Sequence, residues 1–242
     1  MGQAIVRATE GSDKYRILAG VDINADSVAP ACSFPVYQTI SEFPDKADVI
    51  IDFSHHSSLP SLLEYATATK TPIVVCTTGH TDEERQLMAK ATEKTAIFFS
   101  GNMSIGINLL IELCKNASET LGLNFDVEII EKHHNQKLDA PSGTAIMIAD
   151  AIKSTREETE YVYDRHEERR KRSEKEIGIH SVRGGTIVGE HEVIFAGNNE
   201  TITISHTAMS REIFANGALR AAEYLATKGS GSYNMSDLIN GR

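Results

Sequence analysis

The first hundred residues alternate short apolar segments with longer segments of helical periodicity, and this alternation constrains the fold more than any other feature. The apolar segments are residues 16–22, 48–53, 72–76 and 96–99. The helical segments are residues 3–9, 58–70 and 81–93, the last with a capping box between Thr81 and Glu84. Short buried strands separated by helices are typical of a parallel sheet with helices on both faces. We therefore predict an α/β fold with a Rossmann-type, doubly wound parallel sheet.

The pattern changes after residue 104. A long helical segment, residues 105–121, precedes a strand at 125–130 and a helix at 143–153. Three further segments alternate in polarity with no helix between them, at residues 177–183, 188–196 and 200–206. This arrangement predicts a second, α+β domain with a mixed sheet. The last predicted helix, residues 211–228, is amphipathic.

Charge and composition exclude several classes of partner. The chain has 242 residues, is 40% apolar and carries a formal charge of −10. A strongly negative protein is a poor partner for nucleic acid or an anionic membrane surface. The basic residues of segment 165–176 are interleaved with glutamates and lack aromatic neighbours, so we expect a solvated loop there.

The apolar regions and the cysteines indicate the compartment. The longest apolar region, residues 97–114, is interrupted by polar side chains and is not a membrane span. The cysteines Cys32, Cys76 and Cys114 are far apart and form no C-x-x-C motif. Such cysteines are typical of reduced thiols in a cytoplasmic protein. We expect a cytoplasmic protein whose partner is a small molecule.

Polar residues follow several of the predicted parallel strands. Asp22 ends its strand about 20 residues after Gly2, a spacing typical of a ribose-binding acid. The turn at 77–79 offers hydroxyls and backbone N–H groups, and Asn102 follows the next strand. Each residue alone could be a turn or cap residue, but dinucleotides bind at this edge of a doubly wound sheet. Together these residues predict a dinucleotide site.

The start of the chain departs from a complete dinucleotide fold. Such a fold has a first strand and a glycine-rich loop ahead of its first helix. Here Met1 and Gly2 resemble only the end of such a loop. We expect a longer native protein, with about a dozen further residues before Met1. The mass of the native protein tests this expectation.

A cluster of cationic side chains lies just before a predicted helix start. His133, His134 and Lys137 follow the strand at 125–130. Ser142 is a good N-cap for the next helix. The open N–H groups of that helix's first turn favour anions. This combination predicts a carboxylate-binding site with a titratable group beside it.

The histidines have other possible roles. Alone, His133 and His134 could be loop residues or metal ligands, but no second group of ligands shares their spacing, so we expect no metal. His180, His191 and His206 lie on separate predicted strands. We interpret these three as structural or interfacial.

The stretch from Glu128 to Ala145 resembles the 4-hydroxy-tetrahydrodipicolinate reductase (dihydrodipicolinate reductase) family. Its pattern is Glu-x-x-Glu-x-His-His-x-x-Lys-x-Asp-Ala-Pro-Ser-Gly-Thr-Ala. Shorter matching stretches occur at residues 77–79, 102–106, 177–185, 188–191 and 214–218. The resemblance covers essentially the whole chain.

This resemblance implies both an activity and a domain organisation. The activity is hydride transfer from NADH or NADPH to a cyclic imine dicarboxylate, with loss of water, to give tetrahydrodipicolinate in lysine and diaminopimelate biosynthesis. Residues 1–103, completed by 212–242, would form the dinucleotide-binding domain. Residues 104–211 would form the substrate-binding and oligomerisation domain of a homotetramer.

The resemblance also assigns roles to individual residues. It implies that His133 and Lys137 are catalytic and that His134, Gly143 and Thr144 bind the substrate. The implied cofactor-binding residues are Met1, Asp22, Cys76, Thr77, Thr78, Ser100, Gly101, Asn102 and Met103.

Two departures from the family pattern concern the cofactor. Cys76 stands where glycine is common, and Ile23 stands where NADP-using members often carry a basic residue. A carboxylate at Asp22 without a nearby cation repels a 2′-phosphate, so we expect a preference for NADH. Arg7, Lys14 or Arg16 could still reach this position.

Two other functions are compatible with the sequence. One is a remnant of the same family that binds substrate but not cofactor, suggested by the missing glycine-rich loop. The other is a different oxidoreductase of similar architecture that acts on another anionic carbonyl or imine. The run from Lys137 to Thr144 argues against the second.

Overall fold

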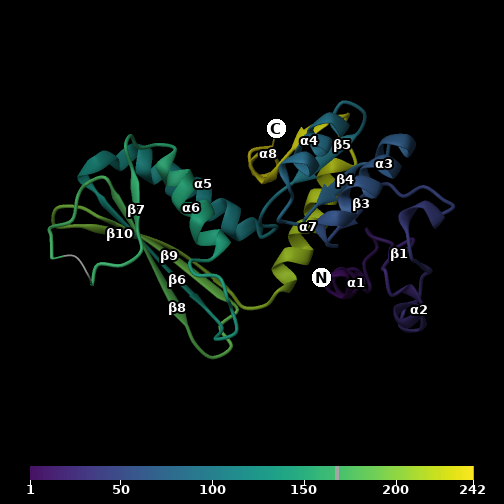
Figure 1. The fold of residues 1–242 in the computed structure, drawn as a ribbon, viewed down its shortest axis with the longest axis horizontal. Coiled ribbons are helices and arrows are strands. Elements are labelled where there is room, and N and C mark those ends of the chain that lie inside the picture. Colours follow the sequence, from purple (N-terminus) through teal and green to yellow (C-terminus); the bar gives the residue numbers. More distant parts are fainter. Residues whose placement is uncertain (167–168, 242) are drawn as a thin grey trace. The chain divides into compact units, whose positions relative to one another are not determined.

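The computed structural model describes residues 1–166 and 169–241, and Figure 1 shows its helices and strands. The chain divides into two compact units. One consists of Met1–Ser104 together with Glu212–Arg242, and the other of Ile105–Arg211. Each unit has its own main sheet and its own buried core.

The first unit is built on a parallel sheet of four strands in the order β11-β5-β4-β3. The strands are β3 (Ile50–Asp52), β4 (Ile73–Val75), β5 (Ala96–Phe99) and β11 (Gly231–Tyr233). The helices of this unit are α1 (Gly2–Thr9), α2 (Ala25–Val28), α3 (Leu59–Thr69), α4 (Asp82–Ala91), α7 (Glu212–Leu225) and α8 (Met235–Ile239).

Successive residues of the central strand β4 are buried against helices on opposite faces of the sheet. Ile73 and Val75 pack with α3 and α4, whereas Val74 packs with α7 and α8. All three side chains are fully buried. Because both faces are covered, the strand is a continuous apolar run without polar alternation. The predicted doubly wound parallel sheet is confirmed.

The predicted strand at residues 16–22 is wrong in length and in burial. The strand β1 covers only Gly20–Val21 and pairs in parallel with β2 (Val36–Tyr37), in a sheet separate from the four-stranded one. Val21 is 43% exposed. A two-stranded pair this short does not bury the side chains of its strands, so apolar composition alone overstated the burial.

The strand β11 has no clear signature in the sequence. Its residues, Gly231, Ser232 and Tyr233, include two with low strand propensity. They are extended because they pair in parallel with β5. Tertiary pairing, rather than local preference, therefore defines this edge of the sheet.

The second unit contains a five-stranded mixed sheet in the order β10-β9-β6-β8-β7. The strand β6 is parallel to β8 and antiparallel to β9. The strands are β6 (Asp126–His133), β7 (Glu160–Val162), β8 (Glu176–Arg183), β9 (Gly189–Ala196) and β10 (Thr201–Ala208). The helices α5 (Ile105–Leu121) and α6 (Gly143–Lys153) pack with β6, β8 and β9 around one core. The predicted mixed sheet is confirmed.

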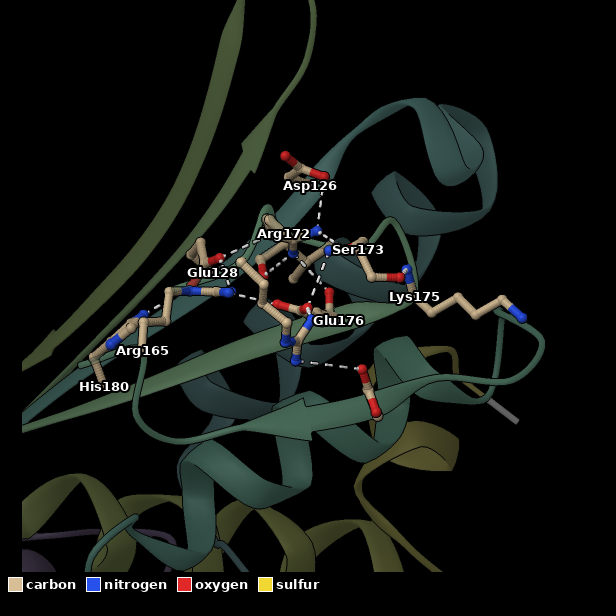
Figure 2. A network of polar contacts seen from close by, with 11 residues as sticks. Asp126, Glu128, Arg165, Arg172, Ser173, Lys175, Glu176 and His180 are labelled. Atoms are coloured by element: carbon tan, nitrogen blue, oxygen red, sulfur yellow. Dashed lines mark hydrogen bonds and ion pairs between the residues drawn. The ribbon is translucent and has the colours of Figure 1, made fainter. Parts of the chain in front are cut away.

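Most of the segment 165–176 is an exposed loop, as its composition predicted, but several of its charges are paired; residues 167–168 lie outside the described part. Figure 2 shows Arg165 and Arg172 close to Glu128 and Glu176 of the sheet. Arg165 and Arg172 pair with Glu128, and Arg165 and Arg170 pair with Glu176, which is fully buried. The interleaved charges therefore form an ion-pair network that fixes this segment to β6 and β8.

The surrounding groups keep Glu176 ionised and leave room for the side chain of Glu128. Burial raises the pKa of Glu176, but hydrogen bonds from the Ser173 backbone, Arg165 and Arg170 outweigh burial and lower it to about 2. Glu128 lies across Gly178 of β8, where an added Cβ would come within 1.7 Å of Oε2. Glycine at that position leaves room for the carboxylate to reach the arginines.

Within the described part of the chain, no helix combines the length and the apolar character needed to cross a membrane.

We predict that Gly217→Ala destabilises the first unit. Gly217 lies in α7, and a Cβ there would come within 1.7 Å of the Met103 carbonyl oxygen. Overpacking against backbone typically costs about 1–3 kcal/mol, which exceeds the gain of about 1 kcal/mol in helix propensity. Chemical denaturation should therefore show a lower free energy of unfolding than in the parent.

The matched control is Gly229→Ala, because an added Cβ at Gly229 meets nothing within 4 Å. This variant should unfold within about 0.5 kcal/mol of the parent. Equal stability of the two variants would contradict the close packing of α7 on Met103.

Candidate active site

The end of β6 places two functional side chains on its buried face. Burial alternates along the strand, with Glu131 and His133 on the side covered by α6. Glu131 is fully buried and His133 is 9% exposed. His134 follows the strand and is half-buried, while Lys137 lies in the loop that leads to α6.

The ring of His133 is held by Glu131. Its Nδ1 lies 2.6 Å from Oε2 of Glu131. Because a carboxylate only accepts, Nδ1 carries the hydrogen and Nε2 is left for chemistry. Nε2 lies over Gly189 of β9, where an added Cβ would come within 3.1 Å of it. The imidazole is thus fixed in one orientation.

The pKa of His133 is lowered from 6.5, chiefly because burial disfavours the charged ring. The charges of Lys137 and Arg183 act in the same direction, while Glu131 opposes them. The group is therefore mostly neutral at pH 7 in the free protein. A nearby negative charge would favour its protonated form.

Glu131 also organises the residues around the histidine. It accepts two hydrogen bonds from the Arg183 guanidinium, each of 2.8 Å, and one of 3.1 Å from the Ser142 backbone N–H. Burial raises the pKa of Glu131, but these donors together with His133 lower it to about 2. One carboxylate thus connects β6, β8 and the start of α6.

The start of α6 is capped as the sequence predicts. Ser142 Oγ accepts from the Ala145 N–H at 3.1 Å and lies 3.1 Å from Nε2 of His191. Gly143 and Thr144 form the first turn, and Gly143 is exposed. Their N–H groups lie at the positive end of the helix dipole.

The buried His191 has no sequence signal for a place beside the site. Its ring centroid is 5.2 Å from that of His133. Burial and the neighbouring His133 lower the pKa of His191 to about 4, so its ring is neutral at physiological pH. By contrast, His180 pairs with Glu128, which belongs to the ion-pair network of segment 165–176.

Lys137 faces an acidic neighbour. Its Nζ lies 2.8 Å from Oδ1 of Asp139, and the side chains are 21% and 58% exposed, respectively. The hydrogen bond from the Lys137 ammonium lowers the pKa of the Asp139 carboxyl below 3.8. The two charges thus compensate each other within the loop that leads to α6.

Sequence reasoning missed four residues of this site: Glu131, Arg183, Asp139 and His191, the last of which we interpreted as structural or interfacial. Glu131 could have been found, because residues two apart on a strand share a face and His133 was already assigned. Arg183 could not have been found in this way. It lies next to the site only because β6 and β8 pair in the register that places His133 opposite Arg183.

The predicted cofactor residues all lie in the first unit, at or near the carboxyl ends of β1, β4 and β5, apart from Met1 at the start of α1. After β4, Thr78 and Gly79 are exposed, and Gly79 has a φ of +81° with open space in front of it. His80 Nε2 lies 3.0 Å from the Thr77 carbonyl and Thr77 Oγ1 donates to Ser54 O, so the turn is anchored from behind.

The remaining predicted cofactor residues differ in accessibility. Asp22 is exposed and accepts from the Asn24 N–H at 2.8 Å. Burial raises the pKa of the Cys76 thiol, which keeps it protonated. Met103 packs into the core, so only its backbone could contact a ligand. The other members of the set are Met1 and Gly101, both exposed, and Ser100 and Asn102, joined by a Ser100 Oγ–Asn102 O hydrogen bond of 2.7 Å.

Among residues 1–166 and 169–241, no group of three or more His, Cys, Asp and Glu side chains could hold a metal ion.

Two family models match successive parts of the chain. "Dihydrodipicolinate reductase, N-terminus" matches residues 1–103, and "Dihydrodipicolinate reductase, C-terminus" matches residues 106–239. The chain belongs to the dihydrodipicolinate reductase family. The predicted resemblance is confirmed.

Individual members of the dihydrodipicolinate reductase family agree with this assignment. The 4-hydroxy-tetrahydrodipicolinate reductase of Caldanaerobacter subterraneus is 50% identical, covering 99% of this chain and 94% of that protein. The enzyme of the same name from Clostridium tetani is 48% identical, covering 99% and 93%. A dipicolinate-bound dihydrodipicolinate reductase from Paenisporosarcina is 25% identical, with a TM-score of 0.79 and coverage of 96% and 92%.

We predict that Glu131→Gln removes a pH-dependent part of the stability. The folded-state pKa of Glu131, about 2, lies below its ordinary 4.5. Its contribution is therefore complete above about pH 5 and is lost as pH falls toward 2, by up to about 3 kcal/mol. Denaturation measured between pH 5 and pH 2.5 should show that the free energy of unfolding falls less with decreasing pH in the variant than in the parent.

At pH 7 the same variant should be about 3–5 kcal/mol less stable, because Arg183 loses its buried partner. The control is Glu192→Gln, because Glu192 is a half-buried carboxylate on the open face of β9. Its free energy of unfolding should stay within about 0.5 kcal/mol of the parent's. Parallel pH profiles for Glu131→Gln and the parent would contradict the role of this carboxylate.

Proposed function

We propose that this protein reduces 4-hydroxy-tetrahydrodipicolinate with NADH or NADPH, with loss of water, to tetrahydrodipicolinate in lysine and diaminopimelate biosynthesis. The observation that carries the proposal is a Glu131-oriented His133 beside Lys137 and the first turn of α6, in a chain of this family. A related protein binds dipicolinate, a planar ring with two carboxylates.

The proposed substrate site is electrostatically suited to a dicarboxylate. Lys137 supplies an ammonium group, and Gly143 and Thr144 supply backbone N–H groups at the start of α6. His134 is half-buried, and its carbonyl oxygen accepts from the Lys137 N–H at 3.1 Å. A charge-assisted hydrogen bond contributes about 1.5–3 kcal/mol. Several such bonds, less the entropy lost on binding, give micromolar affinity, about 8 kcal/mol.

His133 is the proposed proton donor. A bound reduced nicotinamide supplies a hydride, and the substrate ring then holds negative charge until a proton arrives. Burial lowers the pKa of His133, and the negative charges of a bound dicarboxylate would raise it again and favour the protonated ring. Nε2–H of His133 then donates the proton, while Glu131 stabilises the ring through Nδ1.

The first unit is the proposed dinucleotide-binding domain. Its four-stranded sheet has the parallel architecture of such domains, and in the turn at Thr77–Thr78–Gly79 the last two residues are exposed, with open space in front of Gly79. We infer that this turn and the turn from Ser100 to Met103 hold the nicotinamide half, and that Asp22 binds a ribose. Residues 105–211 form the proposed substrate domain.

Assembly and location complete the proposal. We infer a homotetramer formed through the second unit, whose sheet carries exposed apolar side chains such as Val182 and Ile202. We infer a cytoplasmic location because Cys32, Cys76 and Cys114 are all free thiols.

We predict that His133→Gln lowers kcat about 100-fold or more while changing the affinity for substrate much less. The reason is that the proton is needed only after hydride transfer, and general acid catalysis contributes about 10²–10⁴-fold. Oxidation of NADH with freshly generated 4-hydroxy-tetrahydrodipicolinate measures both quantities. Lys137→Ala should damage kcat and KM together, because its charge acts in binding and in the transition state.

His166→Gln is the matched control, since His166 is an exposed histidine of the same unit. It should retain the parent kcat and KM. An unchanged kcat in His133→Gln would remove this residue from the chemical step, and no reduction of the substrate by the parent protein would contradict the proposed function.

The cofactor preference follows from the charges near Asp22. Its exposed carboxylate repels a 2′-phosphate. Two of the cations that could compensate are engaged elsewhere: Lys14 pairs with Glu223, and Arg7 lies 3.9 Å from Glu212. We therefore infer that NADH is preferred.

We predict a kcat/KM for NADH at least about tenfold above that for NADPH, a difference of about 1.4 kcal/mol. Asp22→Asn should bring the two kcat/KM values closer together by raising kcat/KM for NADPH. The control is Asp26→Asn in α2, an exposed carboxylate, which should leave the ratio unchanged. A parent enzyme that prefers NADPH would contradict this reading of Asp22.

A further inference from the structure

His191 lies between the proposed proton donor and the proposed anion-binding helix start. In the register of β6 and β9 it is directly opposite Glu131, so its side chain projects from the same face as Glu131 and His133. Its ring centroid is 5.2 Å from that of His133, and the two rings meet edge to face. Its Nε2 lies 3.1 Å from Oγ of Ser142, the N-cap of α6. One side chain on β9 therefore contacts both parts of the proposed site.

The burial of His191 is unusual for a residue that only packs. The side chain is almost fully buried, and its neighbours on the same face of β9 are the apolar Val193 and Phe195. In the part of the chain that the structure describes, Nδ1 of His191 is buried and has no hydrogen-bond partner in the protein. Burying a polar ring in this way costs free energy that an apolar side chain would not. The imidazole therefore points to a functional requirement at this position.

Ser142 is held from two neighbouring strands. Its backbone N–H donates to Oε1 of Glu131 on β6 at 3.1 Å, and its Oγ is paired with His191 on β9. The same Oγ accepts from the Ala145 N–H in the first turn of α6. Gly143 follows Ser142 directly, so the direction of the open N–H groups depends on where Ser142 is held. The contact with His191 therefore bears on the binding of an anion at this turn.

The ring of His191 also supports the imidazole of His133. Glu131 binds that imidazole at Nδ1, whereas His191 packs against the ring itself. Because burial and the neighbouring His133 lower the pKa of His191 to about 4, the supporting ring is neutral at physiological pH. A neutral ring supports a protonated His133 without the repulsion that a second positive charge would add.

We propose that His191 is a positioning residue, which holds the start of α6 through Ser142 and the proton donor His133 through its ring, and so fixes one relative to the other. The inference rests on the proposed function, because it assumes that His133 donates the proton and that the start of α6 receives a substrate carboxylate. The two contacts act on different quantities. The contact with Ser142 acts on substrate affinity, and the contact with His133 acts on the rate of the chemical step.

The first test removes the contact with Ser142 and keeps the ring. His191→Phe leaves an aromatic ring beside His133 but cannot hydrogen-bond the Ser142 hydroxyl. Calorimetry of dipicolinate binding to the full-length protein should show a dissociation constant that is about three- to tenfold higher, the effect of one lost hydrogen bond. The kcat for NADH oxidation should stay within about threefold of the parent's, because His133 keeps its support.

The second test removes the ring and keeps the contact with Ser142. His191→Gln offers both a donor and an acceptor near the former Nε2, so it can still pair with the hydroxyl. The dissociation constant of dipicolinate should stay within about twofold of the parent's. The kcat should fall at least about tenfold, because small displacements of a reacting group slow the chemical step strongly.

Val193→Ala is the matched control. Val193 is fully buried on the same face of β9, in the core of the unit. The variant should unfold at a lower temperature, because a buried side chain is truncated, but keep the parent kcat and dissociation constant. Opposite patterns in the two His191 variants, with neither pattern in Val193→Ala, would support positioning. Any other pattern, including equal changes of both quantities in the two His191 variants, overturns the proposal.

A double-mutant cycle tests the contact with Ser142 directly. If His191 acts through the Ser142 hydroxyl, His191→Phe should weaken dipicolinate binding in the parent but not in Ser142→Ala. Additive losses of affinity would contradict this link. Should His191→Phe fail to fold, His191→Leu removes the same hydrogen bond with a smaller side chain.

The reductase assay separates this inference from the proposed function. A parent protein that reduces the substrate and binds dipicolinate, with kcat and affinity unaffected in the His191 variants, contradicts only the positioning role. A parent protein that neither reduces the substrate nor binds dipicolinate contradicts the proposed function and the positioning role together.

Discussion

The second unit depends on the buried carboxylate of Glu131. Burying a charge is costly unless it is paired and hydrogen-bonded, and Glu131 meets that condition through Arg183, His133 and the Ser142 N–H. Each partner belongs to a different part of the site: a neighbouring strand, the proposed proton donor and the proposed anion-binding helix start. The same contacts that stabilise this carboxylate therefore fix the relative positions of the reacting groups.

Local charge, rather than net charge, explains how a protein of charge −10 can bind a dianion. Screening at physiological ionic strength limits the global field to about 8 Å. Within that range the site presents the Lys137 ammonium and the start of α6, and its acids are already paired. Glu131 is bound to Arg183, and Asp139 to Lys137. Because the acids near the site are already neutralised by their partners, the positive groups there can attract an anion although the protein as a whole is acidic.

Much of the fold and part of the site could be predicted from the sequence. Lys137, Gly143 and Thr144 lie within eight residues of one another, so their proximity needs only one loop and one N-cap. His191 and Arg183 approach the same site from β9 and β8, through strand registers that local patterns do not reveal. For the same reason, the sequence predicted that segment 165–176 is exposed but not that its arginines pair with carboxylates of β6 and β8.

By itself, the sequence determined the two types of sheet, the helix starts and the family. Hydrophobic periodicity and capping are local properties, so each segment carries that information within itself. Tertiary structure alone decided which charges are paired, where the short strands β1 and β11 lie, and that Asp139 pairs with Lys137. The physical reason is that an ion pair or a strand pairing depends on the distance between groups from separate elements, and only the packed chain fixes that distance.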